Sequence, residues 1–386
     1  MKKVIFLLIL MAFTLTGCWD SVETENLGVV TLIGIGLSTD NNIKVVIHEE
    51  PHEKQTAGKS TNSNQTPFNL YAETGSTISE AVQRMSANEH HRVYFAHTMI
   101  IIVEEELVSL KGIKPIIDFC ERTPEIRLDT WLLISPRGKF EKIISTDVGI
   151  NLSTGKLLQE IINNVKVNPY RTINKMSEVI ELLSKSGSEL YTSGISLTPR
   201  SSAIGTFGGS SSKQKFIIKD TAVFKGEKMV GWLKDEEYMG LSWINGNVKG
   251  GIMTIPFEEN SLSLRIVKMK SEIQAVINDK KLQININTEI ISNIAESQGK
   301  SSFMDEATIK KVNELQGEKI KKEISAAIDK ARSLNSDILG FGSYFNLKYP
   351  KFWKTIKNNW YDYYPNVEVN INVKTIIKNI GKDYKP

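Results

Sequence analysis

The run Met99-Ile100-Ile101-Ile102-Val103 is apolar and almost entirely β-branched. A short run of this kind predicts a buried strand. Trp131 to Ile134 is a second run of the same kind. Between and around them the apolar residues recur at helical spacing, and Thr77 can cap the first such helix, whose inner face holds Ile78, Ala81, Val82 and Met85. Buried strands that alternate with helices indicate an α/β arrangement.

Working outward, the same patterns predict further helices and strands. Helices are expected from the stripe Leu157 to Val165, from 175–185 and from 304–334, where Gly317 interrupts the pattern. Alternating residues predict strands over 281–290 and 367–373. Turn residues predict three hairpins, which pair 29–37 with 44–48, 221–224 with 229–233, and 241–244 with 248–255 around Asn245-Gly246.

The domain organisation is predicted from a change in composition. About half of residues 186–212 are Ser or Gly, which is typical of a linker. We therefore expect an N-terminal α/β region over 18–200, as one unit or as two subdomains, a hairpin-rich middle region over 213–258 and a C-terminal α/β domain over 259–386. The predicted fold class is mixed α/β.

Length and composition fit an ordinary globular protein, because 40% of the 386 residues are hydrophobic and 24% are charged. The net charge is +4 and falls to +2 (4 − 2) if Lys2 and Lys3 are removed. A charge this small does not indicate nucleic acid as a partner.

The N-terminus predicts export and a lipid anchor. Lys2 and Lys3 precede the apolar run Val4 to Phe13, which is too short to span a bilayer and is typical of a secretory signal. Leu15-Thr16-Gly17-Cys18 resembles the bacterial lipobox. That resemblance implies removal of residues 1–17, a diacylglyceryl group on the Cys18 sulfur and an acyl group on its new amine. Two acyl chains anchor a protein stably, whereas one does not.

No catalytic, cofactor or metal site is predicted. Cys120 lies in an apolar stretch and is expected to be a buried, inert thiol. His90, His91 and His97 lie close together but lack the spacing of a zinc site. Gly58-Lys59-Ser60 lacks the earlier glycine of a phosphate-binding loop, and no motif assembles a nucleophile with its base.

The segment 344–364 interleaves aromatic residues with lysines. Two interpretations stay open: its helix packs against a sheet, or it contacts partner subunits or lipid headgroups. The residues proposed for the second role are Trp353, Trp360 and Tyr361.

Several blocks together resemble one family. They are Cys18-Trp19-Asp20 with Glu23, His97 with 100–107 and 111–113, Arg122 to Arg127, Phe224 to Leu233 with Glu237 and 240–241, and Asp337-Ile338-Leu339-Gly340 with Tyr349-Pro350, Trp353 and Trp360. In this order and spacing the chain resembles the Ger(x)C family, the C-subunit lipoproteins of spore germinant receptors.

The resemblance implies a fold, a place and a role. The fold would be three α/β domains, each with a central sheet and packed helices. The place would be the outer face of the spore inner membrane, where the protein assembles with membrane-embedded receptor subunits. The role would be non-catalytic and required for nutrient-triggered germination, without a nutrient ligand of its own. The alternative is a solute-binding lipoprotein that captures a nutrient, which predicts two similar lobes around a cleft.

Overall fold

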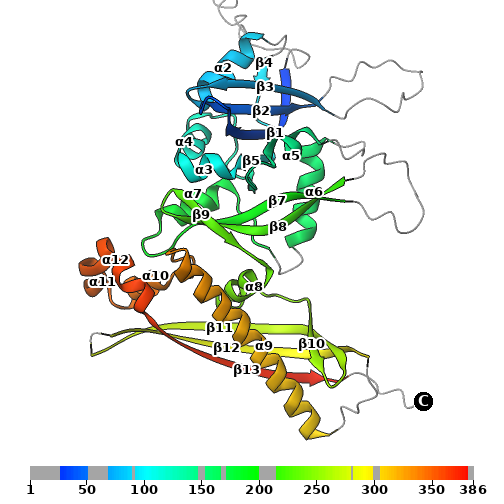
Figure 1. Ribbon diagram of the computed structural model, residues 1–386, viewed down its shortest axis with the longest axis vertical. Coiled ribbons are helices and arrows are strands. Elements are labelled where there is room, and N and C mark those ends of the chain that lie inside the picture. Colours follow the sequence, from blue (N-terminus) through cyan, green and yellow to red (C-terminus); the bar gives the residue numbers. More distant parts are fainter. Residues whose placement is uncertain are drawn as a thin grey trace, which may run out of the picture.

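The chain forms an elongated molecule in the computed structural model, with two β-sheets one above the other (Figure 1). The structure describes residues 27–50, 68–88, 92–146, 153–166, 171–199, 214–279, 281–298 and 305–380. Helices pack on both sheets, so the predicted mixed α/β class is confirmed.

The upper sheet has nine strands in the order β3-β2-β1-β5-β6-β7-β8-β9, and β4 pairs with β1. Its centre, β1-β5-β6, is parallel, and both ends are antiparallel. The strands are β1 Leu27–Leu37, β2 Ile43–Glu49, β3 Asn69–Gly75, β4 Arg92–Tyr94, β5 Ile100–Glu104, β6 Trp131–Ser135, β7 Tyr191–Pro199, β8 Gln214–Lys225 and β9 Lys228–Leu233.

Helices cover both faces of the upper sheet, and this explains why its central strands are apolar throughout. Ile101 packs with the helices of one face, while Ile100 and Ile102 pack with those of the other. The buried strand predicted over 99–103 is therefore confirmed. The helices are α2 Ile78–Asn88, α3 Glu105–Leu110, α4 Lys114–Arg122, α5 Phe140–Ser145, α6 Thr154–Lys166 and α7 Met176–Ser184.

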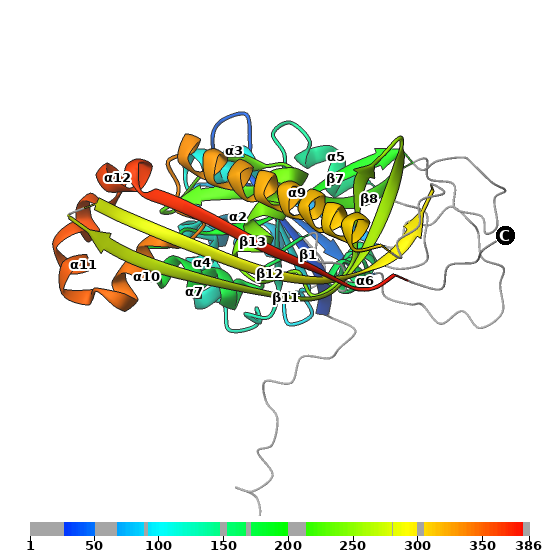
Figure 2. The same ribbon diagram turned by 90° about the horizontal axis from the view of Figure 1, so that it is seen from below.

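The lower sheet has four strands in the order β10-β11-β12-β13. The first three are antiparallel, and β13 lies parallel to β12. They are β10 Ile252–Phe257, β11 Asn260–Asn278, β12 Lys281–Ser297 and β13 Glu368–Asn379. The view from below shows β11, β12 and β13 side by side, with α9 running along β13 (Figure 2).

Helix α8 Asp235–Ile244 connects the sheets, because it contacts β8 and β9 of the upper sheet and β11 and β12 of the lower sheet. It also packs against α9 Glu306–Ser333, which lies against β10 and β13 of the lower sheet. The two helices approach closely because α8 carries Gly240, where a Cβ would lie 1.9 Å from the backbone oxygen of Glu323. At one end of the lower sheet lie α10 Phe341–Lys348, α11 Pro350–Ile356, the 3-10 helix Lys357–Asn359, α12 Trp360–Tyr363 and the 3-10 helix Tyr364–Asn366.

Most predicted elements are present, but two predictions were wrong in part. The hairpin around Asn245-Gly246 does not form, because residues 241–244 are the last turn of α8 and Asn245 caps it. The linker prediction fails over residues 191–199, because these form β7, whose first five residues are buried. Residues 200–213 of that stretch lie outside the described residues.

Candidate functional site

The predicted lipid site, Cys18, lies outside the described residues. The first described residue is Leu27, at the start of β1 in the upper sheet. Nine residue steps (27 − 18) separate the two positions. Among the described residues, no helix is both long and apolar enough to cross a membrane.

The structure brings the three predicted contact residues together at one end of the molecule. Trp353 on α11 and Trp360 on α12 are each 3% exposed, and their rings lie 5.2 Å apart in an edge-to-face contact. Trp360 also packs against Phe345 at 5.8 Å and Tyr364 at 5.9 Å. Packing inside the chain therefore occupies both indole rings.

A buried carboxylate organises this aromatic cluster. One oxygen of Asp337 accepts hydrogen bonds from Trp360 Nε1 at 2.9 Å and from the backbone N–H of Gly342 at 2.8 Å. The other oxygen accepts from the backbone N–H of Phe341 at 2.9 Å. Asp337 thus satisfies the first free N–H groups of α10, as residues at helix N-termini commonly do. We call Asp337, Phe345, Trp353, Trp360 and Tyr364 the Asp337 cluster.

The chain turns sharply beside this carboxylate. Gly340 adopts a φ of 69°, in the left-handed region that favours glycine. Because of this turn, the backbone N–H groups of Phe341 and Gly342 at the start of α10 point at the Asp337 carboxylate. Asp337 and Gly340, the ends of a block singled out in the sequence, therefore form one local structure.

Tyr361, next to Trp360 of the cluster, ties the C-terminal helices to the upper sheet. The Tyr361 hydroxyl donates to Glu189, which lies just before β7. The other oxygen of Glu189 accepts from the backbone N–H of Gly226, in the turn between β8 and β9. Lys225 Nζ lies 4.1 Å from the centre of the Tyr361 ring, a cation–π contact. Tyr361 therefore contacts the upper sheet directly.

Burial raises the pKa of Asp337 to about 7, although its three N–H donors act in the opposite direction. An acid whose pKa is higher in the folded chain than its ordinary value of 3.8 stabilises the fold most when protonated. This contribution is full below about pH 4 and is lost as the pH rises to about 7, by at most about 1.4 kcal/mol per pH unit.

We therefore predict that the wild-type free energy of unfolding rises, relative to that of an Asp337→Asn variant, as the pH falls from 7 to 5. Asparagine does not titrate in this range, so the variant lacks this contribution. Urea unfolding of both proteins at several pH values measures the difference. Parallel pH profiles for the two proteins would contradict the assignment.

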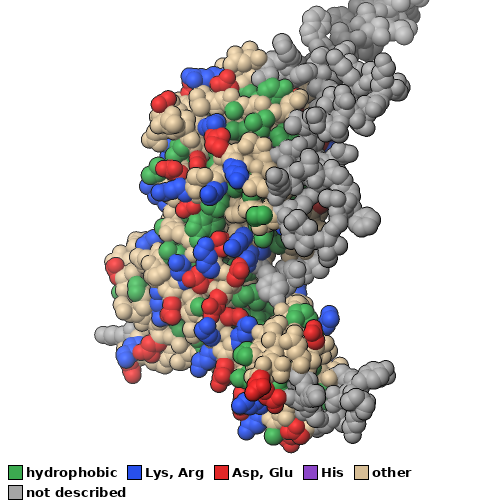
Figure 3. Space-filling model, turned by 45° about the vertical axis from the view of Figure 1, so that its right-hand side comes forward, with side chains coloured by type: hydrophobic (Ala, Val, Ile, Leu, Met, Phe, Trp, Pro, Cys, Tyr) green, Lys and Arg blue, Asp and Glu red, His purple; other side chains and the backbone are tan. Residues whose placement is uncertain are grey.

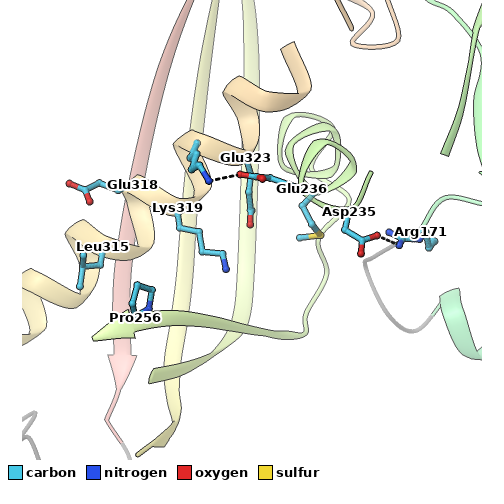
Figure 4. Close-up of a pocket in the computed structure, with 10 residues that line it drawn as sticks. Arg171, Asp235, Glu236, Pro256, Leu315, Glu318, Lys319 and Glu323 are labelled. Atoms are coloured by element: carbon cyan, nitrogen blue, oxygen red, sulfur yellow. Dashed lines mark hydrogen bonds and ion pairs between the residues drawn. The ribbon is translucent and has the colours of Figure 1, made fainter. Parts of the chain in front are cut away.

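The second candidate is a groove of about 770 Å³ between α8, α9 and β10 (Figure 4). Its charges are mostly paired: Arg171 bonds to Asp235, and Lys322 lies 2.9 Å from Glu236. Glu323 accepts from Trp243 Nε1 at 2.6 Å, and burial raises the pKa of Glu323. Figure 3 shows a similar mixture of both charges on the face that it draws. A charged ligand would have to displace these partners.

Other candidates give no site in the described part of the chain. There, no three His, Cys, Asp or Glu side chains are placed to hold a metal ion. His90 and His91 lie outside the described residues, and His97 is exposed. Cys120 is buried and free, as predicted, and burial raises its pKa to about 12.

Two family models together match most of the chain. The model "Spore germination protein N-terminal domain" matches residues 20–197, and "Spore germination B3/ GerAC like, C-terminal" matches residues 219–381. The chain belongs to the Ger(x)C family of spore germination proteins. The first match spans β1 to β7, and the second extends from within β8 to β13.

Curated Ger(x)C proteins are similar to this chain over nearly its full length. Spore germination protein KC of Bacillus subtilis (strain 168) is 21% identical, over 98% of this chain and 96% of the relative. Spore germination protein B3 of the same organism is 22% identical, over 96% of each chain. The crystal structure of the GerBC protein has a TM-score of 0.55 at 15% identity, covering 90% of this chain and 97% of that chain. This last similarity shows a shared fold.

Sequence reasoning located the aromatic residues of this Ger(x)C protein but missed the groups that bind them. Glu189 lies in the stretch interpreted as a linker, and nothing local identifies its bond to Tyr361. Asp337 carried a usable signal, because an Asp just before a predicted helix can satisfy its first N–H groups.

Proposed function

We propose that the protein is a lipid-anchored, non-catalytic subunit of a nutrient germinant receptor at the outer face of the spore inner membrane. Family membership over both matched regions carries the proposal, together with the lipobox resemblance at Cys18. Membrane-embedded receptor subunits are the proposed partners. Replacing Cys18 and following germination and the amount of the other subunits tests the anchoring part.

The anchor would limit how far the protein can lie from the membrane. Nine residue steps reach at most about 30 Å when fully extended. Within that range, a search for membrane partners takes place in two dimensions, and the effective concentration of the partners rises. The anchor would thus favour assembly with the membrane-embedded partners.

We place the partner or headgroup contact on the exposed side of the C-terminal helices. Leu347 on α10 is 83% exposed, and Lys351, Lys354 and Lys357 are exposed on α11 and just after it. Trp353, Trp360 and Tyr361 would contribute by holding these helices in position rather than through free aromatic rings. An exposed apolar side chain among lysines suits either the rim of a protein–protein interface or the surface of an anionic membrane.

We also propose the predicted domain division, with a signal segment over 1–17 and further regions over 18–200, 213–258 and 259–386. One feature favours two subdomains within the 18–200 region: β6 and β7 share a single residue pair, Ile134 with Gly194. Neighbouring strand pairs share five or more.

The alternative, a solute-binding lipoprotein, receives less support. It predicts two similar lobes, whereas the two sheets differ in strand number and pairing. The groove between α8 and α9 would be its binding site. We predict that calorimetry of residues 19–386 with amino acids and sugars gives no saturable heat, because the charges of this groove are already paired. Saturable binding, abolished by Glu323→Gln, would favour the alternative.

A further inference from the structure

Strand β13 has one edge without a partner strand in the part of the chain that the structure describes. The strand is 12 residues long, and β12 pairs with the opposite edge of β13. An open strand edge offers free N–H and C=O groups to a further strand, and proteins usually shorten or cover such edges. This long open edge therefore favours pairing with a strand of another chain.

A groove of about 670 Å³ runs between this edge and α9. Residues 371–373 and Thr375 line it on the side of β13, and Gly317 lines it on the side of α9. A Cβ on Gly317 would lie 3.9 Å from Thr375 Cγ2 and 4.0 Å from the Val373 backbone oxygen. Glycine inside a helix of 28 residues weakens that helix, yet nothing crowds this position. Its effect here is to keep the groove open beside Val373.

The sequence of this edge is complementary to itself. Glu368-Val369-Asn370-Ile371-Asn372-Val373-Lys374 reads the same in both directions, except that its two ends carry opposite charges. Two antiparallel copies centred on Ile371 would place Glu368 opposite Lys374 twice, Asn370 opposite Asn372 twice, and Val369 opposite Val373 twice. Opposite charges and matched side chains at facing positions stabilise strand pairs.

We infer that two copies of this chain pair edge to edge through β13, with a two-fold axis at Ile371, to form one eight-stranded sheet. The open face of the sheet already holds the required side chains in place. Asn285 accepts from Asn370 at 3.0 Å, and Asn287 accepts from Asn372 at 3.4 Å. Pairing would join these two amide pairs into one row across both copies, as in stacked Asn ladders.

The charged ends remain available for the second copy. Glu368 lies 3.6 Å from Lys281, and Lys374 lies 3.5 Å from Glu289, but the side chains of Glu368 and Lys374 are 55% and 68% exposed. Lysine on a strand edge normally prevents pairing. Here it would reject strands that lack an acid at the facing position, so a second copy is the favoured occupant. A two-fold contact of this kind also closes on itself and stops at a dimer.

Sedimentation velocity of residues 19–386, which lack Cys18, tests the inference without the lipid anchor. We expect a reversible dimer at a chain concentration of ~100 µM, with a dissociation constant in the micromolar range. Lys374→Glu and Glu368→Lys each place like charges opposite one another twice, and each should weaken the dimer about tenfold or more. The double variant should restore it, although it loses both ion pairs within the chain.

Two further pairs of variants test the register and the groove. Ile371→Cys should form an intermolecular disulfide on mild oxidation, whereas Val369→Cys should not, because its symmetric copy lies four positions away. Gly317→Gln should fill the groove and abolish the dimer while the thermal midpoint stays level or rises. Gly317→Ala is the matched control, since it strengthens the helix but fills little of the groove.

A chain that stays monomeric at this concentration overturns the inference. A dimer that tolerates Lys374→Glu and Gly317→Gln also overturns it, because the contact then lies on another face. Neither result bears on the germination role, which the Cys18 variant tests separately.

Discussion

Replacement of Cys18 with Ala is expected to release the protein from the spore membrane and to reduce nutrient-triggered germination strongly. The acyl chains proposed on Cys18 contribute about 0.8 kcal/mol for each buried methylene, so two chains hold a protein where a bare chain dissociates. No helix in the part of the chain that the structure describes is long and apolar enough to cross a membrane. Fractionation of broken spores, followed by immunoblotting, measures the membrane-bound share.

The other cysteine provides a matched control. Cys120 is buried in α4 and carries no predicted modification, so Cys120→Ala should cost some stability and leave the membrane-bound share unchanged. Germination triggered by a route that bypasses nutrient receptors should stay normal in both variants. An unchanged membrane share and unchanged nutrient response in Cys18→Ala spores would refute the anchoring proposal.

The sequence predicted those parts of the fold that depend on local pattern and burial. Ile100 to Ile102 identified a central strand, because a strand covered on both faces is apolar at every position. The long helix at 306–333 and the hairpin of β8 and β9 likewise follow from periodicity and turn residues. These elements need no knowledge of distant contacts.

The errors arose where distant contacts decide the structure. Residues 238–244 are buried on every side because α8 lies between the upper sheet and α9, so they show no helical periodicity. The Asn245-Gly246 signal then pointed to a hairpin, although Gly246, with a φ of 69°, follows the helix end. The Asp337 cluster and the neighbouring Tyr361–Glu189 contact bring together segments near 189, 226 and 337–364, and no local pattern reveals these distant contacts.

A variant of Trp360 can distinguish a packing role of this residue from a direct contact with a partner. Its ring packs against Phe345, Trp353 and Tyr364, and its N–H group donates to Asp337. Trp360→Ala should therefore lower the free energy of unfolding by roughly 3–5 kcal/mol, the usual cost of removing a buried tryptophan. Urea unfolding of residues 19–386 measures this loss. In spores, the same variant should reduce the amount of the protein before it affects any contact.

Two companion variants make the result specific. Trp360→Phe keeps most of the ring contacts but removes one donor to a buried carboxylate, so we expect a smaller loss of about 1–3 kcal/mol. Tyr363→Ala, three residues along the same helix, removes a side chain that is 43% exposed and should change stability little. If Trp360→Ala instead folded with wild-type stability yet lost its receptor partners, Trp360 would be a direct contact residue. The packing described here would then be only one of two positions of its ring.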